Sequence, residues 1–393
     1  MLHNKINKCD FYFVLILLCN ISIMIYVVSQ LSISIKEANI FFDNKLLIAK
    51  LANICTSYFG MNDYALRTPN IIFNSLNLIL IYLISKKILK RPYDSVLCAG
   101  IYTLIPGVIL QSTLLNQSSI TLFLALLICY IEIIKKKIIY PLFIVAVFLD
   151  STAFMLFISL FFYALYHKKK KEMLFAAICF FINIYIYGID VSGRPSGKFL
   201  NVVWELSLLY SPLLFIYYIY TLYRNATKEN KSFLLFVSLS SLVVSVIFSI
   251  RQEIDKEIFL FMNLCGIPLV VKQCLSDIRI RLPEFRNSYK NRFIIILMVL
   301  GIEAFSLIFS KGLYFFAKDN YDNFFLNPFY IAKELSIELK KRNIKSITIE
   351  DEGMQKRLQF YGIKKGGAKL KKSKKWGNIE IKYHGVIMAR YII

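Results

Sequence analysis

The sequence predicts an all-α polytopic membrane protein that carries a small C-terminal α/β domain. Two observations predict this fold class. Hydrophobic residues make up 57% of the 393 residues and charged residues only 19%, whereas a soluble domain carries about a quarter charged residues. Long apolar segments also recur along residues 1–311. A helix needs about 20 apolar residues to cross the hydrocarbon layer, and only closed hydrogen-bonding structures can cross it.

The apolar segments predict about eleven transmembrane helices. They are expected at 11–29, 71–88, 94–113, 118–134, 138–150, 152–166, 172–189, 203–223, 232–250, 257–273 and 292–311. Loops rich in Lys and Arg stay in the cytoplasm, so the lysine runs at 135–137 and 168–171 indicate inner loops. We therefore expect a multi-pass protein of the inner (plasma) membrane with a cytoplasmic N-terminus and an extracytoplasmic C-terminus.

The formal net charge of +23 raises the alternative of a nucleic-acid-binding protein. The basic residues cluster in short runs beside apolar segments, which is the positive-inside pattern and not a groove for phosphates. We therefore expect membrane lipids as partners and no nucleic acid. The 8 cysteines lie mostly inside apolar segments without a CxxC pair, so they predict no disulfide or metal framework.

The membrane domain is predicted over 1–311, with an outer loop at 31–69. Between Ile40 and Ile54 apolar residues recur at helical spacing, which predicts one helix lying in the membrane interface. The loop ends at Pro69, which is expected in the first turn of the second span because proline is favoured there.

Residues 312–393 are expected to form the small α/β domain on the outer face. Their pattern changes between helical and strand periodicity. The expected elements are helices at 329–342 and 352–361, a strand at 345–350, a Lys/Gly-rich loop at 364–376, and a hairpin of 379–383 with 386–391. A domain of this size buries little core alone, so we expect it to pack on the membrane part.

Three stretches carry a resemblance to a known family. Lys36-Glu37-Ala38, followed by Phe41-Phe42, resembles an Asp-Glu-Ala-x-Tyr element, and Leu104–Gly107 resembles an "LxPG" element. Phe59-Gly60, followed by Tyr64–Pro69, resembles an "FG…ALRLPS" element. These elements are found in the GT-C glycosyltransferases, integral membrane enzymes that use polyprenyl-phosphate-linked sugars. Within them the chain is most similar to the branch of protein O-mannosyltransferases and lipid A aminoarabinose transferases.

The resemblance implies an enzyme that moves a sugar from a polyprenyl-phosphate donor to a lipid, envelope-glycan or protein acceptor on the outer face. Lys36 stands where the family usually has its catalytic Asp, and Asn116-Gln117 stand where a second acid often follows the third span. Two alternatives stay open: a transporter or flippase of lipid-linked saccharides, and a non-catalytic envelope protein of the same fold.

Glycosyl transfer from a lipid phosphate needs a carboxylate that takes a proton from the acceptor, and cations that hold the leaving phosphate. Glu37, just past the first span, is the expected base, with Asp43 or Asp63 as a second acid. Arg67 at the membrane edge is an expected phosphate ligand. Further expected phosphate ligands are cations of other outer loops, namely Arg194, Arg251 and Lys256.

Each of these residues also has a structural interpretation. Glu37 fits a helix start, Asp63 fits the cap of a turn, and Arg67 fits a side chain that reaches to lipid headgroups. The sequence implies no organic cofactor and no metal ligand set. A divalent cation between Glu37 and another carboxylate stays an open alternative.

Overall fold

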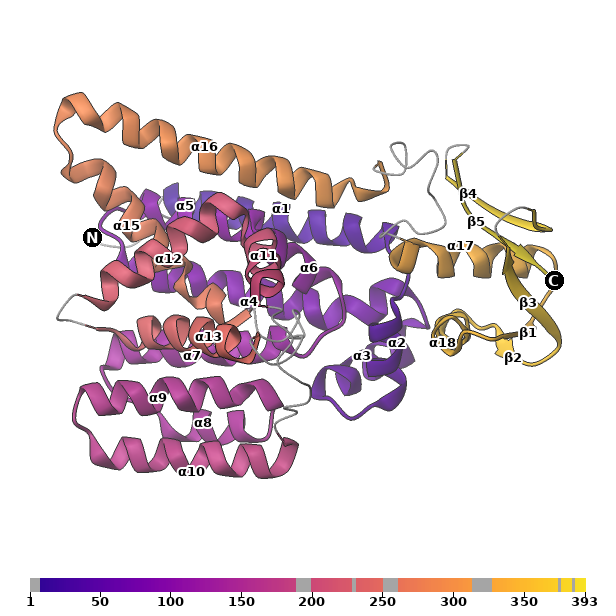
Figure 1. The fold of residues 1–393 in the computed structure, drawn as a ribbon, viewed down its shortest axis with the longest axis horizontal. Coiled ribbons are helices and arrows are strands. Elements are labelled where there is room, and N and C mark those ends of the chain that lie inside the picture. The colour runs from indigo at the N-terminus through magenta and orange to yellow at the C-terminus, as the bar shows by residue number, and fades with distance from the viewer. Residues whose placement is uncertain are drawn as a thin grey trace, which may run out of the picture. The chain divides into compact units, whose positions relative to one another are not determined.

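The structure is a computed structural model that describes residues 8–188, 199–227, 231–249, 261–312, 327–373, 376–383 and 386–393. Within these ranges the protein is mostly helical, with a small C-terminal sheet (Figure 1). The chain divides into two compact units. Unit 1 comprises Met1–Ile21, Ile72–Ser112 and Gln117–Ala304, and unit 2 comprises Ser22–Ile71, Thr113–Asn116 and Phe305–Ile393.

Three long helices contribute residues to both units: α1 (Lys8–Gln30), α4 (Asp63–Ile88) and α16 (Pro283–Ile308). The other helices of unit 1 are α5 (Pro92–Leu104), α6 (Pro106–Thr113), α7 (Ser118–Lys135), α8 (Tyr140–Val147), η1 (Ser151–Ala153), α9 (Phe154–Tyr166), α10 (Lys170–Tyr187), α11 (Phe199–Tyr210), α12 (Pro212–Ala226), α13 (Phe233–Ser249), η2 (Phe261–Gly266) and α15 (Ile267–Ile280).

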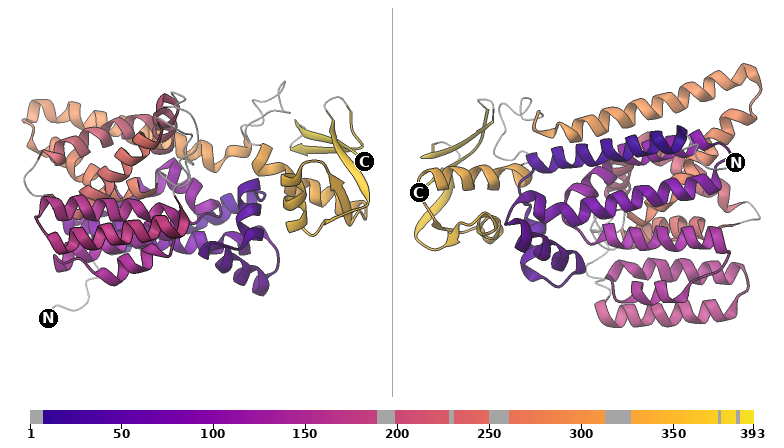
Figure 2. Two further views of the ribbon diagram at one scale, coloured as in Figure 1. Left: turned by 60° about the horizontal axis from the view of Figure 1, so that its bottom comes forward. Right: turned by 180° about the vertical axis from the view of Figure 1, so that it is seen from behind.

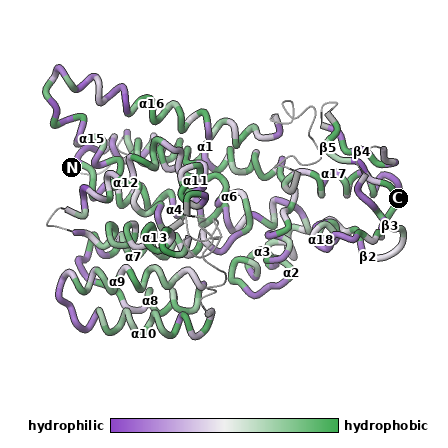
Figure 3. The backbone as a smooth tube through the Cα atoms, in the orientation of Figure 1, coloured by the Kyte–Doolittle hydropathy of each residue, from purple (hydrophilic) through white to green (hydrophobic). Residues whose placement is uncertain are grey.

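Several helices are apolar enough to cross a membrane (Figure 3). Among the described residues, α1, α4, α7 and α16 are also long enough to do so alone. Two bent helix pairs raise the number to 6 if each pair is one span: α5 with α6, at 65°, and the end of α11 with α12, at 105°. The expected count of eleven spans and the assignment of the outer face stay predictions.

The helices α8, α9 and α10 lie side by side in unit 1, as two views show (Figure 2). Asp150 forms the corner between α8 and η1: its carboxylate accepts the Ser151 amide at 2.8 Å and the Thr152 hydroxyl at 2.7 Å. The Asn183 amide of α10 donates to the carbonyls of Val147 and Asp150. A buried polar side chain therefore fixes α10 against this corner.

The segment predicted as an outer loop, residues 31–69, contains two helices of unit 2, α2 (Ile35–Asp43) and α3 (Leu47–Phe59), before α4 begins. The prediction of one helix between Ile40 and Ile54 is therefore wrong. Asn44 takes the left-handed backbone conformation with φ 49°, which ends α2, and its side chain accepts a hydrogen bond from Asn53 at 3.0 Å. Asparagine tolerates this conformation well, so it stops a helix that apolar spacing alone would continue.

The helix α4 begins at Asp63, upstream of the expected start. The Asn62 side chain caps it by accepting the amide of Ala65 at 2.8 Å. Pro69 consequently lies inside the helix, and the prediction that it occupies the first turn is wrong. The early start brings Asp63 and Arg67 onto one helix, one turn apart.

The C-terminal part of unit 2 contains a five-stranded sheet of order β2-β1-β3-β5-β4. Its elements are α17 (Asn327–Lys341), β1 (Ser346–Ile349), α18 (Glu352–Phe360), β2 (Lys364–Lys365), β3 (Ala368–Ser373), β4 (Ile379–Tyr383) and β5 (Val386–Ile392). The strand β1 pairs in parallel with β2 and β3, whereas β5 pairs antiparallel with β3 and β4. The predicted hairpin is thus confirmed.

The prediction of a loop at 364–376 is wrong, because β2 and β3 form there. In β3 the Leu370 side chain is buried while its lysine neighbours are exposed. This strand is held by pairing with β1 on one side and β5 on the other, which local composition does not reveal. The core of unit 2 joins the sheet and both of its helices to Val27, Leu31 and Leu114. The α/β part therefore shares its core with segments at the ends of the apolar helices.

Candidate functional site

Glu37 and Arg67 form a buried ion pair in unit 2. The Arg67 Nε lies 2.8 Å from Glu37 Oε1, and its Nη2 lies 2.9 Å from Oε2. The exposed fractions of the two side chains are 0% for Arg67 and 2% for Glu37. Arg67 also donates to the carbonyls of Leu31 and Ser32, which follow the first apolar helix. The guanidinium thereby ties the start of α4 to the end of α1.

The Glu37 carboxylate is fully occupied by hydrogen bonds. It accepts the amides of Ser34 and Leu115, each at 2.8 Å, in addition to the two bonds from Arg67. The Glu37 amide in turn donates to the Ser34 hydroxyl, so the two residues form a capping box at the start of α2. A carboxylate has about four lone-pair sites, and all four are used here.

The environment of Glu37 favours its charged form. Burial acts to raise the pKa of this carboxyl, but the charge of Arg67 and the hydrogen bonds from Arg67, Ser34 and Leu115 outweigh burial and lower the pKa. A general base needs a lone pair within reach of its proton. The geometry therefore gives Glu37 and Arg67 an architectural role: they join the two ends of the outer loop.

Asp63 lies in a second polar cluster of unit 2. Its side chain is 4% exposed; Oδ2 lies 2.8 Å from Lys333 Nζ, and Oδ1 accepts the Tyr361 hydroxyl at 2.6 Å. The Tyr361 oxygen also accepts the amide of Ile33 at 2.9 Å. Burial and the neighbouring Asp63 carboxylate raise the pKa of Tyr361, so this phenol stays protonated and donates. Each Asp63 oxygen thus has one of these partners.

A second lysine lies near Lys333 in unit 2. Lys311 lies 3.6 Å from the Glu334 carboxylate, and its ammonium is 5.5 Å from the centre of the Tyr330 ring. Burial lowers the pKa of Lys311 against the attraction of Glu334, and repulsion from Lys333 lowers it further. The two ammonium groups are therefore close enough to affect one another.

The helix α18 adds a further buried cation to the outer loop. Arg357 donates to the carbonyl of Ile33 at 2.6 Å and to the Ser32 hydroxyl at 3.2 Å, and it is 2% exposed. Burial lowers the pKa of Arg357.

Sequence reasoning missed Arg357, Tyr361 and Lys333. One signal for Arg357 is its spacing from Met354 and Tyr361 in the chain, which places it on the buried face of a predicted helix.

The structure places the other predicted site residues apart from these clusters or leaves them undescribed. Asp43 is exposed at the last residue of α2. Arg194, Arg251 and Lys256 lie outside the described residues. Of the predicted set, the structure brings Glu37 to Arg67. It pairs Asp63 with Lys333 and also leaves Asp63 within electrostatic reach of Arg67.

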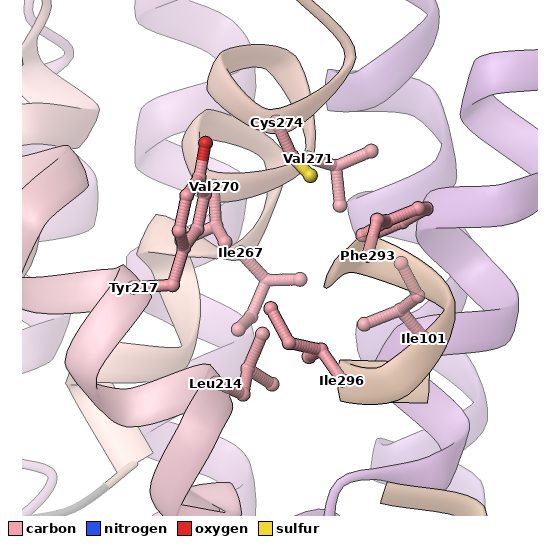
Figure 4. Close-up of a pocket in the computed structure, with 9 residues that line it drawn as sticks. All are labelled: Ile101, Leu214, Tyr217, Ile267, Val270, Val271, Cys274, Phe293 and Ile296. Atoms are coloured by element: carbon pink, nitrogen blue, oxygen red, sulfur yellow. The ribbon is translucent and has the colours of Figure 1, made fainter. Parts of the chain in front are cut away.

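An apolar cavity of unit 1 has a different character. It lies among helices α5, α12, α15 and α16 and has a volume of only about 10 Å³ (Figure 4). Its lining residues are Ile101, Leu214, Tyr217, Ile267, Val270, Val271, Cys274, Phe293 and Ile296. It presents no charged side chain, so it is unsuited to a phosphate.

Within the described ranges, no group of three or more His, Cys, Asp and Glu side chains is arranged to hold a metal ion. Unit 2 thus contains two polar clusters. In the first, the buried Glu37–Arg67 pair holds the backbone. In the second, the buried acid Asp63 pairs with the partly exposed Lys333. The second cluster is the one suited to proton transfer and anion binding.

Comparisons of this chain with models of known protein families and with curated protein sequences find no match.

Proposed function

We propose that this protein is a membrane glycosyltransferase that moves a sugar from a polyprenyl-phosphate donor to a lipid, envelope-glycan or protein acceptor. The observation that carries the proposal is the pair formed by Asp63 and Lys333, 2.8 Å apart. The exposed fraction of Lys333 is 28%, against 4% for Asp63. An acid and an accessible cation thus stand together in the unit that holds the outer loop. The lysine-rich loops favour an extracytoplasmic position in the plasma membrane for this unit.

In the proposed reaction the donor phosphate binds Lys333 and competes with Asp63 for its ammonium group. Asp63 is then free to accept the proton of the acceptor hydroxyl. The acceptor oxygen forms a bond to the anomeric carbon, the bond from that carbon to the phosphate oxygen breaks, and the phosphate keeps the electron pair. Lys333 and Lys311 stabilise the negative charge that remains on the lipid phosphate.

This assignment moves the base from Glu37 to Asp63. Glu37 has its lone pairs filled by two backbone amides and Arg67, whereas each Asp63 oxygen carries a single bond from Tyr361 or Lys333. Arg67 is fully buried, so Lys333 is a better phosphate ligand. Roles for Asp43, Arg194, Arg251 and Lys256 stay predictions from the sequence.

The proposal is tested by mass spectrometry of envelope glycolipids and glycoproteins from cells with and without the gene. We expect one glycan to lose a sugar when the gene is deleted and to regain it with the wild-type gene. Asp63→Asn and Lys333→Gln should fail to restore it, while Glu352→Gln, which changes an exposed acid at the start of α18, should restore it. Melting temperatures of the purified variants separate loss of transfer from loss of folding. An unchanged glycan profile after deletion would overturn the proposal.

A second candidate is a non-catalytic envelope protein of the same fold. It is favoured by the occupied carboxylate of Glu37 and by Lys36, which stands where the resembling enzymes have an acid. Under this alternative, Asp63→Asn changes the melting temperature but changes no glycan. The complementation experiment distinguishes the two, because it measures both quantities on the same variants.

A further inference from the structure

A basic hollow in unit 1 lies outside the proposed site. It has a volume of about 390 Å³, is open to solvent, and lies at the turn from α9 to α10. Its lining consists of Tyr140, Lys168, Lys169, Lys170, Lys171 and Glu172. Four lysines stand against one glutamate, so the hollow is strongly cationic. Such a concentration of positive charge in a concave surface favours an anionic ligand.

The backbone of this turn has a defined conformation. The Lys168 amide donates to the Leu165 carbonyl and the Lys169 amide to the Ala164 carbonyl, which together close a Schellman motif at the end of α9. Lys168 takes the left-handed conformation with φ 56°, where glycine is usual. Lys169 is held by Glu172 at 3.1 Å. The hollow is thus formed by a tight turn with defined geometry and not by a loose loop.

The start of α10 adds to the attraction for anions. Lys169 precedes the helix without capping it through its side chain, so the first amide groups of an 18-residue helix point toward the lysine-lined end. The amide groups at the helix start and the lysine side chains both attract a phosphate. Together they make this end of α10 suited to phosphate groups.

An exposed apolar stripe continues from the hollow along α10. Leu174, Ile178, Phe181 and Tyr185 follow Lys171 at intervals of three and four residues, and their exposed fractions are 64%, 50%, 68% and 91%. Residues at this spacing share one helix face. At 1.5 Å per residue, the stripe from Lys171 to Tyr185 extends about 21 Å, longer than half of a ~30 Å hydrocarbon layer. Figure 3 shows the change from a hydrophilic turn to hydrophobic helices.

We propose that this hollow and stripe bind an anionic phospholipid with two phosphates, of the cardiolipin type. The two phosphates lie among Lys168, Lys170 and Lys171, and one acyl chain follows the stripe of α10. The joint presence of a cationic hollow and an adjoining apolar face selects a lipid over a soluble anion. A headgroup with two phosphates complements several lysines better than a headgroup with one.

The test uses the full-length protein purified in a mild detergent, with native mass spectrometry to count retained lipid. We expect retention of cardiolipin above phosphatidylglycerol, and no retention of phosphatidylcholine. Lys168→Gln/Lys170→Gln/Lys171→Gln should weaken cardiolipin binding about 100-fold, since each lysine near an anionic lipid contributes roughly a factor of five. Lys169 is kept because it contacts Glu172.

The matched control removes the same charge from exposed lysines of the sheet, through Lys364→Gln/Lys365→Gln/Lys369→Gln. This variant should retain cardiolipin as the wild type does. Equal loss in both triple variants would show a general charge effect and overturn the site. Equal retention of phosphatidylglycerol and cardiolipin would overturn the two-phosphate headgroup. Retention of inorganic pyrophosphate equal to that of cardiolipin would overturn the lipid assignment.

Discussion

The guanidinium of Arg67 and the carboxylate of Glu37 meet in two hydrogen bonds, of 2.8 and 2.9 Å, although they stand at opposite ends of the outer loop. Both side chains are almost completely buried. The same carboxylate caps α2 and accepts the amide of Leu115. One ion pair thus fixes three chain segments of unit 2, and its loss should affect the whole unit.

Removing one partner of this pair should destabilise the protein strongly. Arg67→Met leaves a buried carboxylate without its counter-charge, which costs about 3–5 kcal/mol. Glu37→Leu with Arg67→Met removes both charges and should recover part of that loss. Thermal unfolding of the single and double variants in detergent measures the coupling. Lys50→Ala, on the exposed side of α3, is the control. A melting temperature of Arg67→Met equal to that of the control would contradict the assignment.

The ion pair also predicts a dependence of stability on pH. The pKa of Glu37 lies below its ordinary value of 4.5 in the folded protein. A lowered carboxyl pKa stabilises the fold above the pKa of the unfolded chain, and this contribution is lost as the pH falls through the folded value. We expect the stability difference between wild type and Glu37→Gln to be constant from pH 8 to about pH 5 and to narrow below about pH 4.5. A difference that widens on acidification would contradict this.

The break between α2 and α3 depends on the backbone of Asn44. Asn44→Gly keeps the left-handed conformation accessible. It should lower the free energy of unfolding by less than about 1 kcal/mol, because only the hydrogen bond from Asn53 is lost. Asn44→Val should destabilise by about 1–3 kcal/mol, because a β-branched residue is strained at φ 49°. Chemical denaturation measures both. Equal stability of the two variants would show that the backbone conformation at Asn44 does not decide the break.

Helical periodicity and turn residues predicted much of the local structure. The C-terminal hairpin and the helices at α17 and α18 follow patterns of apolar spacing, which local sequence expresses directly. The strand β3 does not, because four of its six residues are charged or polar and its pairing depends on β1 and β5. The early start of α4 depends on the Asn62 cap, which competes with the stronger signal of Pro69.

The candidate site could be predicted only in part for a similar reason. Glu37 and Arg67 are conspicuous because each is a charge at the edge of an apolar segment. Their mutual contact is a tertiary fact, and so is the approach of Lys333 to Asp63 across 270 residues of sequence. A sequence without its fold shows which charges exist but not which are neutralised by one another. That distinction separates an architectural pair from a candidate for chemistry.

The Tyr361 hydroxyl joins the C-terminal part of unit 2 to residues 33 and 63. The hydroxyl donates to Asp63 at 2.6 Å and accepts the Ile33 amide at 2.9 Å. Tyr361→Phe keeps the ring but leaves a buried amide and a carboxylate oxygen without this partner, which costs roughly 1–3 kcal/mol for each group that finds no water. We expect a lower melting temperature and faster cleavage of the C-terminal part by protease.

Tyr391→Phe is the matched control for Tyr361→Phe, because Tyr391 is also a buried tyrosine of unit 2. It removes a hydroxyl from the sheet and leaves the bond to Asp63 in place. If Tyr361→Phe and Tyr391→Phe lower the melting temperature and the protease resistance equally, the loss reflects a buried hydroxyl in general. A larger decrease in both quantities for Tyr361→Phe would show that the two hydrogen bonds of the Tyr361 hydroxyl, to Ile33 and Asp63, stabilise unit 2. Because Asp63 is also the proposed base, the same variant should lower sugar transfer by a larger factor than Tyr391→Phe does.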